Sequence, residues 1–296
     1  MVGPTVRKAA VKHLVDDFDR SERHSCRVVG ISRTAIHYAP LLKADEANLR
    51  ARIKALAHVH RRYGYRRVTG ILHGEGWSVN VKRVHRIWKA EGLGLRAKRP
   101  KRRRYASTGE VIRKAEYRNH VWAWDFMQDR TEKGGVIKIL NIVDEYTRQA
   151  LAMRVAQRID SRDIVDTFKV LMRANGCPDF IRSDNGPEFI AERVRRSLVD
   201  SECKSIYIKP GSPWENAYIE SFNGKFRDEC LNMNIFNSGR EAMEIVNEWC
   251  HEYNELRPHS SLNYLTPNEF ARRYGSSLRA TPSGHCHTDS PGNPKL

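Results

Sequence analysis

The hydrophobic pattern from residue 121 onward restricts the fold of this chain more than any other feature of its sequence. Three short apolar runs follow one another with brief connections, which favours antiparallel pairing of neighbouring strands. Helical and strand-like segments then alternate. We expect strands at residues 121–127, 135–143, 149–156, 179–182 and 204–208, and helices at 161–174, 192–200, 216–231 and 238–254. This order of elements predicts an α/β fold with a mixed five-stranded sheet.

The N-terminal part has helical patterns instead. Its first unit carries short helices at 11–18, 21–29 and 32–38, and Gly30 separates the last two. This layout is typical of a helix-turn-helix, whose second helix would carry Arg33, although many small helical bundles share it.

A second helical unit follows, with helices at 45–60, around 68–72 and after Asn80. The last helix has an apolar inner face and an outer face that carries Lys82, Arg83 and Arg86. A charged outer face is often only solvated. Because both units carry the same sign of charge, we expect them to contact DNA.

The positive charge of the chain is confined to its N-terminal part. Of the net +17, residues 1–120 hold 29 Lys and Arg against 10 Asp and Glu, and the remainder has a net charge of −2. Residues 96–104 contain seven basic residues and are expected to form a linker along DNA phosphates, with a nuclear localisation signal as the competing interpretation. The expected DNA contacts in this half are Arg33, Arg66, Arg67, Lys82, Arg83, Arg86, Lys98, Arg99, Lys101, Arg102, Arg103 and Arg104.

The bulk composition indicates a globular cytoplasmic protein. The chain has 296 residues, 40% of them hydrophobic, which is enough for a sizeable core. It has no uninterrupted apolar run of membrane-spanning length, and its six cysteines form no C-x-x-C pair. We therefore expect reduced thiols and no membrane association.

Three acidic residues stand out in the predicted α/β region. Asp125 lies inside a strand, where aspartate is unfavourable, Asp184 follows the fourth strand, and Glu220 lies on a helix 35 residues further on. Each has a simpler explanation, as a hydrogen-bonded buried Asp, a turn residue and a surface Glu. Other acids compete for the same role, namely Asp129, Asp144, Glu188, Glu215 and Asp228.

Three carboxylates that converge repel one another unless cations compensate them. Oxygen ligands favour Mg²⁺ or Mn²⁺ over zinc. Two such ions would activate the attacking oxygen and stabilise the leaving oxygen of a phosphodiester. The three acids, if they converge, therefore predict an enzyme that cuts or joins nucleic acid.

The motifs around these acids resemble those of bacterial insertion-sequence transposases of the IS-three group, within the retroviral integrase superfamily. The resemblance rests on Ser-Asp-Asn-Gly-Pro-Glu-Phe at 183–189, on Asn-Ala-Tyr-Ile-Glu-Ser-Phe-Asn-Gly-Lys-Phe at 216–226, and on Arg-Pro-His-Ser-Ser-Leu at 257–262. Tyr-Gly-Tyr-Arg-Arg at 63–67 is similar to the group's helix-turn-helix region. The similarity covers about residues 10–275.

The resemblance implies an RNase H-like core at 118–278, with a two-ion Mg²⁺ or Mn²⁺ site formed by Asp125, Asp184 and Glu220. It implies a DDE-type transposase that cleaves the terminal inverted repeats of its element and transfers the DNA 3′ end to target DNA. Arg227 matches a basic position near the DNA. The implied partners are double-stranded DNA, further copies of the chain and an upstream-frame product, as a fusion or separately, in a bacterial, nucleoid-associated setting.

The remaining boundaries are expectations of the same kind. We expect helix-turn-helix-like segments at 1–40 and 41–95, a basic linker at 96–117 and a disordered tail at 279–296. Two other functions stay open from the sequence: a catalytically inert DNA-binding product that regulates transposition, and an RNase H-like nuclease.

Overall fold

The computed structural model describes residues 3–38, 43–94, 114–208 and 216–275. The chain divides into two compact units, Met1–Arg52 and Ile53–Leu296. The basic run at 96–104 and the tail at 279–296 lie outside the described residues. Among the described helices, none has the length and apolar character needed to cross a membrane.

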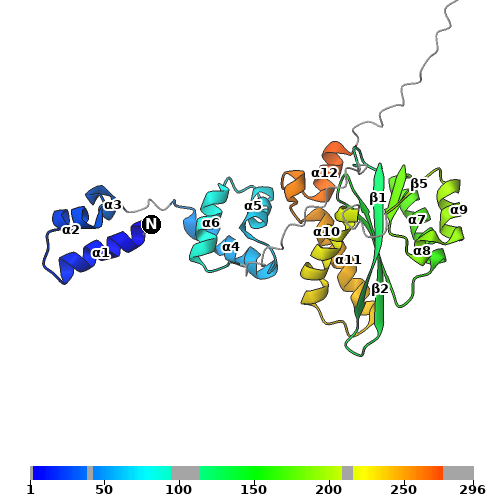
Figure 1. Cartoon of the computed structure of the whole chain (residues 1–296), viewed down its shortest axis with the longest axis horizontal. Helices are drawn as coiled ribbons and strands as arrows, with labels where there is room; N and C mark the ends of the chain where they lie inside the picture. Colours follow the sequence, from blue (N-terminus) through cyan, green and yellow to red (C-terminus); the bar gives the residue numbers. More distant parts are fainter. Residues whose placement is uncertain (1–2, 39–42, 95–113, 209–215, 276–296) are drawn as a thin grey trace, which may run out of the picture. The chain divides into compact units, whose positions relative to one another are not determined.

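The first unit contains three helices, α1 (Pro4–Asp16), α2 (Glu22–Val29) and α3 (Arg33–His37) (Figure 1). α1 begins earlier than the apolar pattern predicts because Pro4 occupies its first turn, where a missing N–H costs nothing. Gly30 adopts a left-handed conformation with φ of 69° and ends α2. The Ser32 side chain then accepts a hydrogen bond from the Ala35 N–H and caps α3. The predicted helix, turn and helix are therefore present.

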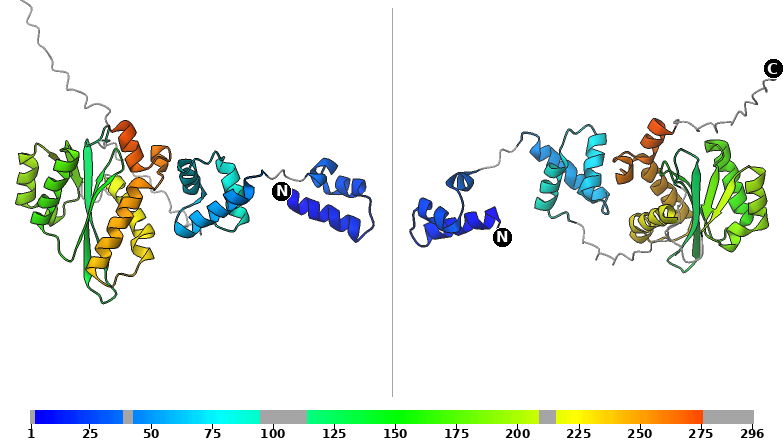
Figure 2. Two further views of the ribbon diagram at one scale, coloured as in Figure 1. Left: turned by 180° about the vertical axis from the view of Figure 1, so that it is seen from behind. Right: turned by 45° about the horizontal axis from the view of Figure 1, so that its top comes forward.

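α4 (Glu46–Val59) spans the division between the two units, and α5 (Tyr65–Gly74) and α6 (Val81–Ala90) follow it (Figure 2). The Asn80 side chain caps α6 by accepting from the Lys82 N–H at 2.8 Å. Val84, Ile87 and Trp88 are buried, as their spacing predicts.

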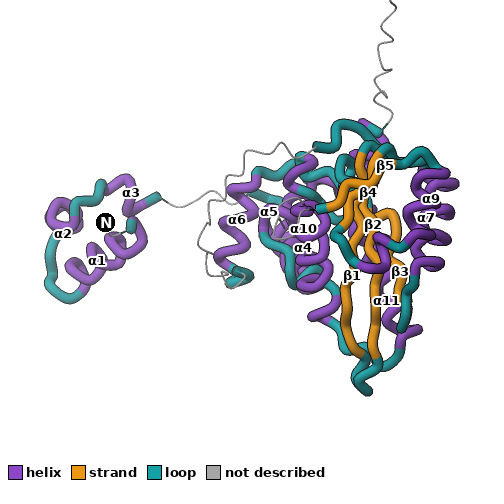
Figure 3. Tube along the Cα trace, turned by 45° about the vertical axis from the view of Figure 1, so that its right-hand side comes forward, coloured by secondary structure: helices purple, strands orange, loops and turns teal. Residues whose placement is uncertain are grey.

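A five-stranded sheet forms the centre of the second unit, with strand order β3-β2-β1-β4-β5 (Figure 3). β1 pairs antiparallel with β2 and parallel with β4, so the sheet is mixed, as predicted. The strands are β1 (Val121–Arg130), β2 (Val136–Asp144), β3 (Ala150–Ala156), β4 (Phe180–Ser183) and β5 (Lys204–Tyr207).

Helices cover both faces of this sheet (Figure 1). One face packs against α10 (Ala217–Glu229) and α11 (Gly239–Glu255), and the other against α7 (Ser161–Asn175), α8 (Pro187–Ile190) and α9 (Glu192–Asp200). Alternate residues of β1 face opposite ways, so that Ala123 lies in the α10 core and Trp124 in the α7 core.

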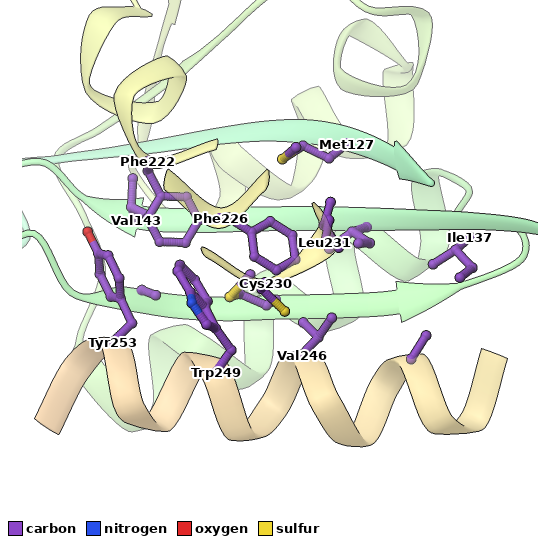
Figure 4. Packing of buried hydrophobic residues seen from close by; sticks show 14 of the residues in the cluster. Met127, Ile137, Val143, Phe222, Phe226, Cys230, Leu231, Val246, Trp249 and Tyr253 are labelled. Atoms are coloured by element: carbon purple, nitrogen blue, oxygen red, sulfur yellow. The ribbon is translucent and has the colours of Figure 1, made fainter. Parts of the chain in front are cut away.

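The core between the sheet and α11 is largely aromatic. Trp249 and Tyr253 on α11 pack against Phe222 and Phe226 on α10, with ring centroids 4.9 to 5.7 Å apart in three of these pairs (Figure 4). This packing fixes the position of α10 against the sheet. Phe222, Phe226 and Cys230 lie in this core, whereas Tyr218, one turn earlier on α10, lies outside it beneath the guanidinium of Arg148.

Among the described residues, two short α-helices were not among the expected elements, and neither were the 3-10 helices Leu231–Met233 and Ser260–Leu262. α8 (Pro187–Ile190) follows directly from the predicted turn, with proline in its first turn. α12 (Pro267–Tyr274) begins at a capping box in which Thr266 and Glu269 each accept a hydrogen bond from the other's backbone N–H.

Candidate active site

The pairing of β1 with β4 brings Asp125 and Asp184 close together beside the carboxyl end of β4. Val121, Trp122 and Ala123 lie opposite Phe180, Ile181 and Arg182, a constant offset of 59 residues. Continued two residues past the last pair, this register sets Asp125 opposite Asp184. This register sets Asp125, the fifth residue of β1, beside Asp184, which directly follows the last residue of β4.

A chain of amide hydrogen bonds ties Asp125 to α10. The side chain of Asn141, opposite Asp125 on β2, donates to Asn223 Oδ1 at 2.8 Å, and Asn223 Nδ2 donates to Asp125 Oδ2 at 2.8 Å. Glu220 lies three residues before Asn223 on the same helix, so both occupy one face of α10. The face that carries Glu220 is therefore directed toward Asp125.

Asp184 combines the two roles that its sequence context suggested. Its Oδ1 accepts a hydrogen bond from the Gly186 N–H at 3.0 Å, which forms the turn, and its side chain remains exposed. A Cβ at Gly186 would lie only 2.9 Å from that oxygen, so a larger residue would displace the carboxylate. Asn185 fastens the turn to the sheet by donating to the Ile208 carbonyl at 2.9 Å.

The surroundings of the Asp125 carboxyl group raise its pKa. Burial raises its pKa from 3.8 to about 6, against hydrogen bonds from the Phe126 N–H and from Asn223 that lower it. The negative charges of Asp184 and Glu220 raise the pKa further. The three acids are therefore electrostatically coupled, with Asp125 half-buried and the other two exposed.

The three carboxyl groups do not form a closed cage. Across the described ranges, no group of three His, Cys, Asp or Glu side chains is arranged closely enough to hold a metal ion by itself. The three acids therefore interact electrostatically, while the side chains of Asp184 and Glu220 remain exposed to solvent.

Four of the competing acids are held by other groups. Glu188 pairs with Lys138 of β2, which lowers its pKa. Asp144 is buried and accepts from the backbone N–H groups of Asn119, Tyr146 and Thr147, and Asp129 accepts from the next backbone N–H. Asp228 lies 3.9 Å from Arg62. Glu215 lies outside the described residues.

The predicted DNA contacts differ in how far they are already engaged. Arg33 donates to Glu22 at 3.1 Å, and Arg67 donates to Glu229 at 2.8 Å. Arg227 is exposed and donates to the Gln128 carbonyl at 3.1 Å, along β1 from Asp125. Arg66, Lys82 and Arg86 are exposed and Arg83 is half-buried. Lys98, Arg99, Lys101, Arg102, Arg103 and Arg104 lie outside the described residues.

The sequence reasoning missed the residues that hold the acids in place. Asn223 and Asn141 link Asp125 to α10, yet an asparagine on a helix or strand is common for many reasons and carries no distinctive pattern. A signal was available for Asn141, because a polar residue within the apolar run 136–144 requires a partner.

Similarity to known proteins assigns the chain to the integrase-type polynucleotidyl transferases. Residues 115–213 and residues 201–267 match two models of the integrase core domain, and residues 43–103 match an HTH-like domain. Among solved structures, the catalytic core domain of HTLV-2 integrase in complex with magnesium is similar to this chain, with a TM-score of 0.39. It shows 17% identity and covers 52% of this chain and 97% of that chain.

Proteins encoded by insertion elements are similar along most of the chain. An uncharacterized 31.7 kDa protein of insertion element IS407 from Burkholderia multivorans is 38% identical over 88% of this chain and 94% of its own length. An uncharacterized 39.2 kDa protein of IS476 from Xanthomonas euvesicatoria is 36% identical over 92% of this chain and 79% of its own length. The transposase of IS904 from Lactococcus lactis is 29% identical over 76% of this chain and 93% of its own length.

The chain belongs to this family of insertion-sequence transposases with an integrase core, of the DDE type. Membership implies binding to DNA, assembly into oligomers on DNA and dependence on a divalent metal ion.

Proposed function

We propose that Asp125, Asp184 and Glu220 are the catalytic acids and hold two Mg²⁺ or Mn²⁺ ions, with which the protein cleaves the ends of its insertion sequence and joins them to target DNA. The observation that carries this proposal is the β1–β4 register together with the Asn223 hydrogen bond. Because of these two features, three acids from distant parts of the sequence would lie around one site beside the end of β4.

The donor set fits the ions. All three ligands would be carboxylates, and the mutual repulsion that raises the pKa of Asp125 is the imbalance that a divalent cation relieves. When bound, such ions lower the pKa of an attacking hydroxyl and neutralise charge on the phosphate. The protein's own residues fix the acids: Asn223 holds Asp125, Gly186 holds Asp184, and the aromatic core of α10 holds the helix of Glu220.

Other proposed features concern partners and domains. The N-terminal part would bind the terminal inverted repeats, in keeping with the positive charge of residues 1–120. It comprises the helical segments at 1–40 and 41–95 and the basic linker at 96–117. An upstream-frame product, fused or separate, would add further DNA-binding capacity. Arg227 would contact DNA beside the acids, since its exposed side chain lies on the Glu220 face of α10.

Strand transfer tests the site directly. The chain, alone and fused to its upstream frame, is incubated with labelled terminal repeats, a target plasmid and Mg²⁺. We expect wild type to join ends, and Asp184→Asn to bind the repeats and join none. Asp200→Asn, which makes the same charge change at an exposed position on α9, is the matched control and should retain joining. Equal joining by Asp184→Asn would contradict the assignment, and binding without joining by every wild-type form would favour an inert DNA-binding product.

A further inference from the structure

A groove runs beside α10 on a different side of the helix from Glu220. It consists of two adjoining cavities of about 490 and 420 Å³, which share Lys225, His259, Ser260 and Ser261 as lining residues. We call it the α10 groove. Its second cavity reaches Phe222 and Tyr253, the aromatic residues at the left of Figure 4. The groove thus lies between the catalytic helix and the segment Arg-Pro-His-Ser-Ser at 257–261.

The first cavity has a strongly positive lining. Arg66, Arg67, Lys225 and Arg257 line it, and none of its described lining residues is acidic. Arg257 is almost fully buried and donates to both oxygens of Glu229, at 2.7 and 2.6 Å, and Arg67 donates to the same carboxylate. The carboxylate of Glu229 is therefore shared by two guanidinium groups. No acidic residue that lines this cavity balances the charges of Lys225 and Arg66.

Lys225 forms no hydrogen bond or ion pair with any residue that the structure describes. It is half-buried, and burial together with the charges of Arg257 and Arg67 lowers its pKa to about 8. The same surroundings, burial first and the charge of Arg257 next, lower the pKa of the buried His259 to about 2. An ammonium group placed among other cations without a partner is unfavourable unless an anion occupies the site.

Arg148 gives a second, independent indication in the other cavity. Its guanidinium stacks over the ring of Tyr218 at 3.9 Å from the centroid, and its Nε and Nη1 atoms are buried without a hydrogen-bond partner in the described structure. Its backbone is in the left-handed region, with φ of 65°, a strained conformation that occurs often at functional sites. Two acids also line this cavity: Glu145 pairs with Arg182 at 2.8 Å and interacts electrostatically with Arg148, and Asp144 accepts backbone N–H groups.

We propose that the α10 groove binds a backbone phosphate of DNA through Lys225, Arg148 and the exposed hydroxyl groups of Ser260 and Ser261. Ammonium, guanidinium and hydroxyl groups that line one groove match a phosphodiester, which is anionic and accepts several hydrogen bonds. The proposal rests on the proposed action of the protein on DNA.

The position of the groove indicates which part of the DNA it holds. Lys225 lies five residues after Glu220, which is about 7.5 Å along the helix axis, or roughly two nucleotide steps of 3.4 Å. The groove would therefore hold a phosphate a few nucleotides from the one that reacts. Its role is to position the strand.

The salt dependence of DNA binding tests the site without catalysis. The full chain is titrated with fluorescent element-end and unrelated duplexes in chelator, at several salt concentrations, as wild type, Lys225→Gln and Lys225→Arg. Each lost phosphate contact reduces the slope of log K against log salt by about 0.9. We expect this reduction and a several-fold weaker affinity on both duplexes in Lys225→Gln, and recovery of the slope in Lys225→Arg. Lys169→Gln, an exposed lysine on α7 at the other face of the sheet, should not change the slope.

Thermal unfolding separates binding from folding. Without DNA, Lys225→Gln should melt no lower than wild type, because it removes one cation from a cationic cluster. An unchanged salt slope, or a lower melting temperature without DNA, would overturn the proposal. Stabilisation by inorganic phosphate that depends on Lys225, with an unchanged slope for DNA, would assign the groove to free phosphate instead. If strand transfer fails but the slope changes as expected, the groove stands and the proposed chemistry fails.

Discussion

Replacing Asp125 with asparagine should stabilise the metal-free protein. The folded-state pKa of Asp125 is about 6, against an ordinary value of 3.8. A carboxyl group with a raised pKa contributes stability that is present below the unfolded-state pKa and is lost as the pH rises through the folded-state value. Near neutral pH, the ionised Asp125 therefore destabilises the fold, and Asp125→Asn removes that charge.

The magnitude follows from the pKa and the hydrogen bonds. A difference of roughly two pKa units corresponds to about 3 kcal/mol at full ionisation. The variant amide turns an NH₂ group toward one of the two donors, the Phe126 N–H and Asn223 Nδ2, at a cost of about 1 kcal/mol. The net gain should be about 2 kcal/mol near pH 8, and less than about 1 kcal/mol near pH 5, where wild-type Asp125 is mostly protonated.

Thermal unfolding in chelator at these two pH values measures the effect, as a gain of a few degrees at the higher pH. Asp129→Asn is the matched control, because Asp129 lies on the same strand and accepts the same kind of bond from the next backbone N–H without contacting Asn223. Mn²⁺ should then raise the melting temperature of wild type more than that of Asp125→Asn. A variant no more stable than wild type near pH 8, or an equal gain at both pH values, would refute the reasoning.

Two further substitutions test the supports of the site. Glu229→Gln leaves two arginines without their shared carboxylate and should destabilise the protein by about 3–5 kcal/mol in thermal or urea unfolding, whereas the exposed Glu244→Gln should cost less than about 0.5 kcal/mol. If both variants unfold alike, the shared carboxylate has no structural role. Gly186→Ala should displace Asp184 and lower strand transfer at least tenfold while the melting temperature changes little. Gly224→Ala, where an added Cβ meets nothing within 4 Å, should leave transfer intact. Full activity in Gly186→Ala would show that the turn does not position the acid.

The sequence was sufficient for the elements of the core and insufficient for their contacts. Period-two and helical patterns are local, so the five strands and the helices between them could be predicted from runs such as 121–127. The register of β1 against β4 depends on pairing between segments 59 residues apart, and no local pattern specifies it. That Asp125 and Asp184 lie close together could be expected from the predicted arrangement of the strands and from the resemblance to a family, but their register could not.

Some local signals were present and were not used. The Thr-Pro-Asn-Glu sequence at 266–269 has the residues of a capping box and begins α12. The hydrogen bond of Arg67 to Glu229, in contrast, has no local signal in the sequence. Nothing near Arg67 in the sequence indicates that its partner is Glu229, 162 residues away, so a residue expected to face DNA also holds α5 to α10.

Two cations, a proton and a divalent metal ion, would compete for the oxygens of Asp125. Oδ1 faces the Phe126 N–H and Oδ2 faces Asn223 Nδ2, so both oxygens meet donors. Each oxygen keeps a further lone pair, which either a proton or a metal ion can take. Burial alone favours the protonated carboxyl group, whereas the two donors favour the ionised one. A doubly charged ion would relieve most of the repulsion that remains among the three acids. Because the pKa of Asp125 is about 6, a divalent ion held there as proposed must displace a proton below that pH, and its affinity should fall as the solution becomes more acidic.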